Sequence, residues 1–254
     1  MTLDEEETST KTPNPLTQPS TNSSTLKPRD FSGSLISAVL INGDGLVNRF
    51  KKTICSAGFW ARNATDPDIN YVVTAGHCFL NAPGNLNFYN HRSWNSQDWK
   101  RKGSNFVGKA EKYFIKPFDA GLIFVEGNYK PSMVIRNTDS DLFTELWIMN
   151  DILVPSVGAH LCKTGYVTHV TCGHIKSFNG FFINEFSFGR AFIFDTSESR
   201  GGDSGGTAFS YQDLRHVSLI GVHSASGFDI SVTTPLRTIL DSFDIEPYLL
   251  KFSD

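Results

Sequence analysis

The sequence has little that would hold it in a membrane or on a nucleic acid. No apolar stretch approaches the roughly 18 residues that a membrane-spanning helix needs. The formal net charge of −3 gives no electrostatic reason to expect nucleic acid or an anionic membrane as a partner. The basic run Lys100-Arg101-Lys102 is typical of a solvated loop. Residues 1–7 are acidic and lack the apolar core of a secretory signal, so no export signal is visible there.

Cysteine is scarce, and its spacing lacks a zinc pattern. None of Cys55, Cys78, Cys162 and Cys172 forms a Cys-x-x-Cys pair, and no histidines cluster at zinc spacing, so we expect no metal and no cofactor. Four cysteines allow three pairings. The two local pairs, Cys55–Cys78 and Cys162–Cys172, close the shortest loops and are the expected ones. Each disulfide would stabilise the fold by about 2–4 kcal/mol, which indicates an oxidising, secreted or extracellular destination.

The composition changes near residue 30. Residues 1–30 are rich in Ser, Thr and Pro with almost nothing apolar, which predicts a disordered arm or the remnant of a leader. Residues 31–254 have the composition of a globular domain, large enough for one all-β unit or two small domains. Asn22-Ser23-Ser24 and Asn63-Ala64-Thr65 fit the N-glycosylation pattern, which has meaning only in an exported chain.

Short β-branched and aromatic runs, separated by Gly, Asn, Asp and Pro, predict an all-β sandwich or barrel. Helical spacing appears only at Pro235–Phe243, whose apolar residues at 236, 239, 240 and 243 form one face. The predicted strands are Leu35–Ile41, Thr53–Ala61, Asn70–Ala75, Ala120–Glu126, His160–Lys163, Thr171–Phe178, Ala191–Phe194, Gly206–Tyr211, Val217–His223 and Ile230–Thr233.

A serine flanked by glycines is the most informative local feature. In Ser199-Arg200-Gly201-Gly202-Asp203-Ser204-Gly205-Gly206 the glycines permit a tight turn and the close approach of a substrate carbonyl to the hydroxyl. They also leave the backbone N–H groups of Gly202 and Ser204 free to point at a developing oxyanion. On its own, this run is equally typical of a flexible glycine-rich loop.

Two further segments decide between these interpretations. An apolar strand leads into Thr74-Ala75-Gly76-His77-Cys78, and Phe118-Asp119-Ala120-Gly121 places an aspartate at the start of another apolar strand. The three segments, in the order His, Asp, Ser, closely resemble those of the chymotrypsin-like serine peptidases. The resemblance implies two six-stranded antiparallel β-barrels with a short C-terminal helix, their boundary falling near residues 130–155.

The resemblance assigns a role to each of these residues. Ser204 would be the nucleophile, His77 the general base and then acid, and Asp119 the residue that orients the imidazole. Gly202 and Ser204 would form the oxyanion hole, and a Cys55–Cys78 disulfide would fix the histidine loop.

A second cysteine pair narrows the resemblance to one branch. The segments around Cys162 and Cys172 look like the stapled hairpin of the streptogrisin and alpha-lytic peptidases. That branch pairs the aspartate before the nucleophile with an internal basic residue, which predicts a buried Asp203–Lys163 pair without N-terminal cleavage. The branch's disulfide beside the specificity pocket is missing, and Thr207 stands where proline is commoner.

The segment Gly221-Val222-His223-Ser224-Ala225-Ser226-Gly227 is predicted to form the wall of the specificity pocket. In this family the serine at the position of Ser224 supports the triad aspartate, and the residues just beyond it, with Ala225 first, bind substrate. Glutamate-selective members have a histidine and a serine at the positions of His223 and Ser226. An imidazole and hydroxyls can bind a carboxylate, more strongly when the imidazole is protonated. Ser199 and Arg200 could add donors, whereas the simpler alternative makes His223 a satisfied strand histidine.

Three functions therefore remain open. The first is a monomeric serine endopeptidase acting on peptide or protein substrates, with a possible preference for Glu before the scissile bond. The second is a catalytically silent homologue that acts as a binding or regulatory module, against which the complete triad argues. The third, an α/β-hydrolase esterase, is disfavoured because the Gly-x-Ser-x-Gly elbow is missing and the order is His-Asp-Ser.

Overall fold

The computed structural model describes residues 39–50, 53–80, 86–91, 94, 105–153, 156–183 and 188–250. All of them belong to the second of two compact units, which begins at Ser37. The predicted N-terminal arm, the Asn22 sequon, most of the predicted strand Leu35–Ile41 and the basic run at residues 100–102 lie outside the described residues. Among those described, no helix is both long and apolar enough to span a membrane.

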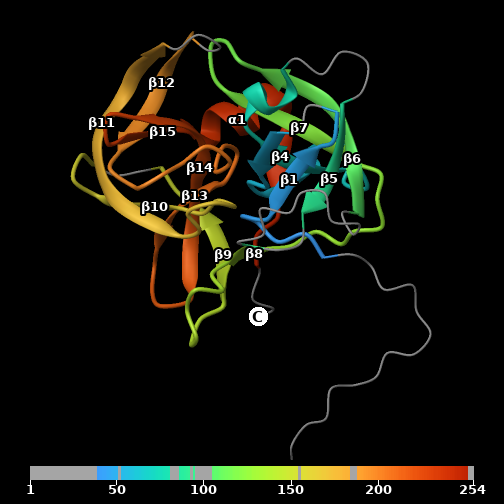
Figure 1. Cartoon of the computed structure of the whole chain (residues 1–254), viewed down its shortest axis with the longest axis horizontal. Coiled ribbons are helices and arrows are strands. Elements are labelled where there is room, and N and C mark those ends of the chain that lie inside the picture. Colours follow the sequence, from blue (N-terminus) through green and yellow to red (C-terminus); the bar gives the residue numbers. More distant parts are fainter. Residues whose placement is uncertain are drawn as a thin grey trace, which may run out of the picture. The chain divides into compact units, whose positions relative to one another are not determined.

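The first sheet has eight strands and is built almost wholly from the N-terminal half of the described chain. Figure 1 shows most of these strands, coloured blue to green, gathered beside the second sheet, whose strands run from yellow-green to red. In spatial order the first sheet comprises β16 (Ile245–Pro247), β3 (Trp60–Asn63), β4 (Asn70–Thr74), β7 (Ala120–Val125), β6 (Asn105–Phe114), β5 (Asn87–His91), β1 (Gly45–Asn48) and β2 (Thr53–Ser56).

The second sheet closes into a barrel. Because β13 pairs with both β10 and β14, six of its strands form a ring, and β9 and β8 extend it beyond β14. The pair β9–β14 is parallel, which departs from the all-antiparallel expectation. The strands are β13 (Thr207–Tyr211), β10 (His160–Lys163), β11 (Thr171–Ile183), β12 (Phe188–Asp195), β15 (Ile230–Pro235), β14 (His216–Gly227), β9 (Glu145–Asp151) and β8 (Val134–Arg136).

The apolar core has a part in each sheet and a part shared by both. The largest cluster combines Phe59 and Val73 of the first-sheet region with Phe209 and Val222 of the second sheet, and it includes the apolar face of helix α1 (Leu236–Phe243). The predicted helix is confirmed, and its buried residues are the four expected from the spacing. The all-β fold built from two sheets is confirmed as well, although each sheet has eight strands and not the six expected.

One predicted strand is wrong in its extent, and part of another is not a strand. Thr53–Ala61 is divided into β2 and β3, because Gly58 lies where an added Cβ would be 2.6 Å from the Gly205 carbonyl oxygen and 2.7 Å from that of Val73. The chain bends at this point to pass between two neighbours. Residues 39–41, the described end of the predicted strand Leu35–Ile41, are not in a strand.

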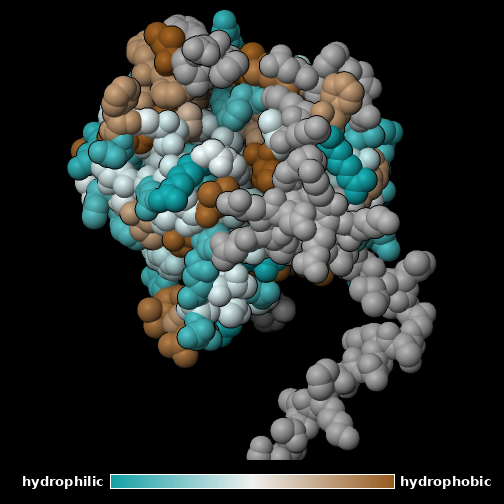
Figure 2. Space-filling model, viewed as in Figure 1, coloured by the Kyte–Doolittle hydropathy of each residue, from teal (hydrophilic) through white to brown (hydrophobic). Residues whose placement is uncertain are grey.

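The surface of the described residues mixes polar and apolar side chains. On the face shown in Figure 2, hydrophilic and hydrophobic residues are interspersed, without one apolar area dominating the coloured surface. The site that the sequence predicts therefore has to be located from side-chain geometry, not from a surface patch.

Candidate active site

His77 is presented by a short 3₁₀ turn after a buried strand. β4 ends at Thr74, and the turn Gly76–Phe79 follows. Gly76 is required there because an added Cβ would lie 1.8 Å from the Phe114 carbonyl oxygen. The His77 side chain is 30% exposed, and its Nδ1 lies 2.7 Å from Asp119 Oδ2. The backbone N–H of His77 also donates to Asp119 Oδ1 at 2.8 Å, so both carboxylate oxygens hold the same residue.

Asp119 is buried at the start of β7 and anchored through its own backbone. Its carbonyl oxygen accepts hydrogen bonds from the hydroxyls of Thr234 at 2.8 Å and Ser224 at 3.4 Å. These two hydroxyls are 2.7 Å from each other. Ser224 therefore supports Asp119 through the main chain and not through the carboxylate. Sequence reasoning missed Thr234, and no local pattern singles it out.

Ser204 lies in a turn that both sheets hold in place. The Ser56 N–H in β2 donates to the Ser204 carbonyl oxygen at 2.7 Å, while the Gly205 N–H donates to the carbonyl oxygen of His223 in β14 at 2.8 Å. Gly202 and Gly205 adopt positive φ angles of 111° and 90°, which favour glycine. Among the described residues, no backbone carbonyl accepts a hydrogen bond from the N–H groups of Gly202 and Ser204.

These elements meet in one cleft of about 320 Å³. The cleft contains all three predicted catalytic residues and all the predicted pocket residues, so segments more than a hundred residues apart in the sequence share one site. Its lining consists of His77, Asp119, Ser199, Arg200, Gly201, Ser204, His223, Ser224, Ala225 and Ser226.

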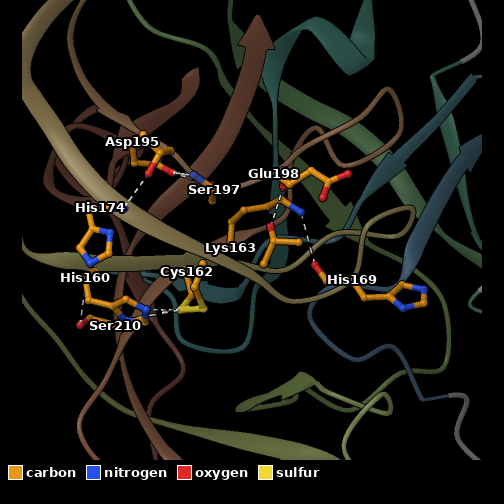
Figure 3. The surroundings of a disulfide bond; sticks show 12 residues. His160, Cys162, Lys163, His169, His174, Asp195, Ser197, Glu198 and Ser210 are labelled. Carbon is orange, nitrogen blue, oxygen red and sulfur yellow. Dashed lines mark hydrogen bonds between the residues drawn. A yellow bond between two sulfur atoms is a disulfide. The ribbon is translucent and has the colours of Figure 1, made fainter. Parts of the chain in front are cut away.

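Asp203 lies beneath this turn and contacts Lys163. Lys163 Nζ is 3.3 Å from Asp203 Oδ2, and neither side chain has exposed surface. Lys163 also donates to Thr168 Oγ1 and to the His169 carbonyl oxygen, the latter contact being drawn in Figure 3. The Asp203 carboxylate accepts further hydrogen bonds from the Thr168 hydroxyl and from the N–H groups of Val167, Thr168 and Arg200.

The charges of this pair are set by burial and by the hydrogen bonds. Burial on its own would raise the pKa of Asp203, but the Lys163 ammonium and the Thr168 and backbone donors outweigh it and hold that pKa below its ordinary value. Burial lowers the pKa of Lys163, against the opposing effect of the Asp203 charge. The five donors that converge on Asp203 favour its ionised form.

Both local disulfides are present. Cys55–Cys78 joins β2 to the turn that carries His77, and Cys162–Cys172 links β10 to β11 at directly paired positions. Figure 3 shows Cys162 beside Lys163, so the second disulfide braces the strand from which the lysine extends. Two groups of potential metal ligands occur among the described residues, each built on two of these cysteines. Disulfide sulfurs have no thiolate to offer a metal.

His223 and Ser224 point to opposite faces of β14. His223 is buried, and its Nε2 lies 2.6 Å from Ser199 Oγ, while Ser224 faces Asp119. Burial, assisted by the charge of Lys163, lowers the pKa of His223 to about 3. Its imidazole is therefore neutral at neutral pH. In this neutral form His223 lacks the charge that would strengthen a hydrogen bond to a carboxylate.

The other predicted pocket donors are already engaged. Ser226 is exposed, and its hydroxyl lies 3.4 Å from the Ser199 carbonyl oxygen, so the two walls of the pocket touch. The Arg200 guanidinium bonds to Glu198 at 2.8 Å and is directed to solvent. A neighbouring hollow of about 550 Å³ shares Ser199 and Ser226 with the cleft and is lined by Glu198 and Asp229 among others.

Solved structures with similar folds come from bacterial serine proteases. Thermobifida fusca Protease A matches with a TM-score of 0.65 and 19% identity, over 84% of this chain and 100% of that chain. Nocardiopsis Protease matches with a TM-score of 0.64 and 20% identity, over 83% of this chain and 99% of that chain. A third match is a serine protease described as specific for glutamic acid and as using a histidine triad in substrate binding. Its TM-score is 0.66 at 22% identity, over 82% of this chain and 100% of that chain.

Sequence comparison adds nothing to these structural matches, since no protein-family model and no curated protein matches the chain. The two sheets, the order of their strands and the extent of the structural matches lead to one conclusion about architecture. This chain has the two-barrel fold of the bacterial chymotrypsin-like serine proteases.

Proposed function

We propose that this chain is a serine endopeptidase that cleaves peptide bonds through an acyl-enzyme on Ser204. The observation that carries the proposal is the 2.7 Å contact between His77 Nδ1 and Asp119 Oδ2 in the same cleft as Ser204. A carboxylate on Nδ1 keeps the proton on that nitrogen, so the lone pair that a base needs is on Nε2. That arrangement suits a histidine that must remove a proton from a hydroxyl.

The proposed reaction has two halves. Ser204 Oγ attacks the peptide carbonyl carbon while its proton passes to His77 Nε2, and the N–H groups of Gly202 and Ser204 bind the oxyanion. His77 then gives the proton to the leaving amine, the C–N bond breaks, and an ester remains on Ser204. Water hydrolyses that ester, with His77 again accepting and returning a proton. The Asp119 carboxylate holds Nδ1 throughout and stabilises the imidazolium.

A phosphonofluoridate probe separates this proposal from a silent binding module. We expect the probe to label Ser204 in the folded wild-type chain, and we expect Ser204→Ala to abolish labelling without changing the circular dichroism spectrum. Ser210→Ala, a serine on the partly buried end of β13 outside the cleft, is the matched control. Properly folded wild-type protein that takes up no probe would favour the silent module.

We further propose that no N-terminal cleavage is needed for activity. Asp203 already has a buried cation within the chain, because Lys163 lies 3.3 Å away. The Asp203–Lys163 pair would thus order the turn that carries the oxyanion N–H groups. The full chain is therefore expected to react with the probe at the same rate as a chain trimmed near residue 36; slow labelling that trimming accelerates would contradict this.

For selectivity, we propose that the pocket prefers a side chain with an acceptor oxygen, glutamate in particular, before the scissile bond. Ser199, whose hydroxyl is hydrogen-bonded to His223 Nε2 at 2.6 Å, lines the cleft wall together with His223 and Ser226. Glu198, which directly precedes the pocket residue Ser199, is 61% exposed and already paired with Arg200, which argues against selection of basic residues. The similar protease described as specific for glutamic acid supports the same direction.

Matched peptides that differ only at this position test the selectivity. We expect kcat/KM to fall in the order Glu, then Gln, then Leu, Phe and Arg. Preference for Phe or Arg over Glu would contradict the proposal. The natural setting we propose is extracellular, with a monomeric enzyme acting on peptide or protein substrates, because two disulfides need an oxidising compartment to persist.

A further inference from the structure

The second barrel contains three buried polar atoms without a partner among the described residues. They are His223 Nδ1, Thr233 Oγ1 and Asp195 Oδ2. Each belongs to a residue with at most 1% exposure. A buried polar group that loses water without gaining a partner is costly, so three of them in one barrel call for an explanation.

The strand pairings place all three on the same interior face. Thr233 in β15 is directly opposite His223 in β14 on one side and Ile193 in β12 on the other. Directly paired residues project to the same face of a sheet, and Ile193 belongs to the apolar cluster inside this barrel. Asp195 follows Ile193 by two residues and so shares its face. Thr233 is thus on the strand between β14 and β12, directly opposite His223 and diagonal to Asp195, whose direct partner is Ser231.

Asp195 is half satisfied by its own chain. Its Oδ1 accepts hydrogen bonds from the N–H and the hydroxyl of Ser197, as Figure 3 shows in part. Its Oδ2 has no such partner, and burial raises the pKa of the carboxyl group. Lys163 is the cation that acts on Asp195, and Lys163 and Asp203 are the other charged groups that act on His223 from the same barrel.

We propose that Thr233 and an internal water form a hydrogen-bonded site behind His223, which fixes the proton of this histidine on Nε2 and thereby makes the specificity pocket a hydrogen-bond donor. The proposal deepens the proposed function, because it gives the physical origin of the selectivity for acceptor side chains. Thr233 is a positioning residue in it and does not touch the substrate.

The site suits a water molecule because buried waters typically make about three hydrogen bonds to otherwise unsatisfied groups. A water beside Thr233 accepts a hydrogen bond from the threonine hydroxyl and donates one to His223 Nδ1. Its second proton goes toward Asp195 Oδ2, directly or through one more water. If Asp195 is protonated, its own proton points toward the water, and Nδ1 still receives a hydrogen bond. In either case His223 Nδ1 is an acceptor.

The tautomer decides what the pocket offers to a substrate. A neutral imidazole has one donor and one acceptor nitrogen. With Nδ1 accepting, the Nε2 proton points at Ser199 Oγ, 2.6 Å away. The Ser199 hydroxyl proton is then free to point into the cleft, where it can bind a carboxylate or amide oxygen. With the proton on Nδ1 this hydrogen bond would reverse its direction. Ser199 would then donate to His223 and offer only lone pairs to the substrate.

Imidazole nitrogen NMR tests the tautomer without any substrate. The full chain carrying Ser204→Ala, labelled with ¹⁵N-histidine, is used to prevent self-digestion, and the His223 signals are assigned with His223→Gln. At pH 7 we expect a proton-bearing Nε2 and a bare Nδ1. Thr233→Val keeps the shape but removes the hydroxyl, so it should shift the Nδ1 resonance, whereas Thr233→Ser should restore it. Thr164→Val removes another buried, unpartnered hydroxyl and should leave His223 unchanged.

Kinetics on Glu and Phe peptides provide the functional readout. Because a single hydrogen bond is worth about 1 kcal/mol, Thr233→Val should lower the Glu-to-Phe ratio of kcat/KM about fivefold, and Thr233→Ser should recover it. A proton on Nδ1 in the parent chain, or His223 signals indifferent to Thr233→Val, would overturn the inference. If the wild-type chain cleaves no peptide but the NMR result holds, the proposed function fails and the internal site stands.

Discussion

Lys163 and Asp203 form an ion pair that is wholly buried beneath the turn carrying Ser204, with 3.3 Å between Nζ and Oδ2. Removing one partner of such a pair leaves an unpaired buried charge, which is far more costly than losing a surface ion pair. The pair is therefore a point outside the cleft at which a single substitution is costly.

Lys163→Met should destabilise the protein by about 3–5 kcal/mol and abolish labelling of Ser204 by the probe. The measurement is urea unfolding followed by fluorescence. The double variant Lys163→Met/Asp203→Asn should recover part of the lost stability, since it removes the orphaned charge. Lys109→Met, which breaks an exposed pair with Glu126, should cost less than about 1 kcal/mol. Equal losses for the two single variants would contradict the buried pair.

Asp119→Asn should reduce kcat about 10⁴-fold, because an amide in place of the carboxylate no longer holds the Nδ1 proton of His77. The protein should remain folded, and the hydrolysis of a chromogenic peptide measures the loss. Asp139→Asn is the control, since Asp139 contacts Nδ1 of a histidine outside the cleft, His169, at 2.6 Å. The idea fails if both variants lose activity to a similar degree.

The pH dependence of stability should carry the signature of His223. Its pKa is about 3 in the folded protein against roughly 6.5 in an unfolded chain. Between pH 6.5 and 3 the unfolded state therefore binds a proton at this residue that the folded state does not bind. Stability falls as the pH drops through this range. One such group contributes a slope of about 1.4 kcal/mol per pH unit. Urea unfolding at pH 7, 5.5 and 4.5 should show that His223→Gln has a shallower slope than wild type.

Gly205→Ala should inactivate the protein and destabilise it. An added Cβ would lie 2.0 Å from Thr74 Oγ1, and φ is 90° at this position. Strain of this kind costs about 1–3 kcal/mol before the clash is counted. Gly201→Ala in the same turn has nothing within 4 Å of its Cβ and should change the unfolding free energy by less than about 0.5 kcal/mol. Thermal unfolding of both variants decides the matter.

The sequence predicted the strands that carry chemistry better than those that only complete the sheets. β10 at His160–Lys163 matches its prediction, and β14 continues past the predicted end at His223 to Gly227. In contrast, β6 at Asn105–Phe114 was missed, because its exposed face carries charged residues and leaves no continuous apolar run. β1 and β5 were missed as well, because they contain glycine or asparagine, residue types that are depleted in strands.

The site shows the same division. Motifs identified His77, Asp119 and Ser204 because tight turns impose glycine and small residues around them. Thr234, which bonds to the Asp119 carbonyl oxygen, has no such local requirement and follows from the pairing of distant strands. The neutral state of His223 was also beyond sequence reasoning, since it depends on burial and on the distance to Lys163.

Ser56 belongs to the first sheet, yet its hydroxyl donates to the Gly202 carbonyl oxygen and accepts the Tyr166 N–H, both at 2.8 Å. Its backbone N–H binds the carbonyl oxygen of Ser204. One residue of the first sheet is thus hydrogen-bonded to two loops of the second. A small shear between the sheets would therefore move the turn that carries Ser204. For the same reason, a ligand that fills the cleft would make both sheets more rigid at this contact.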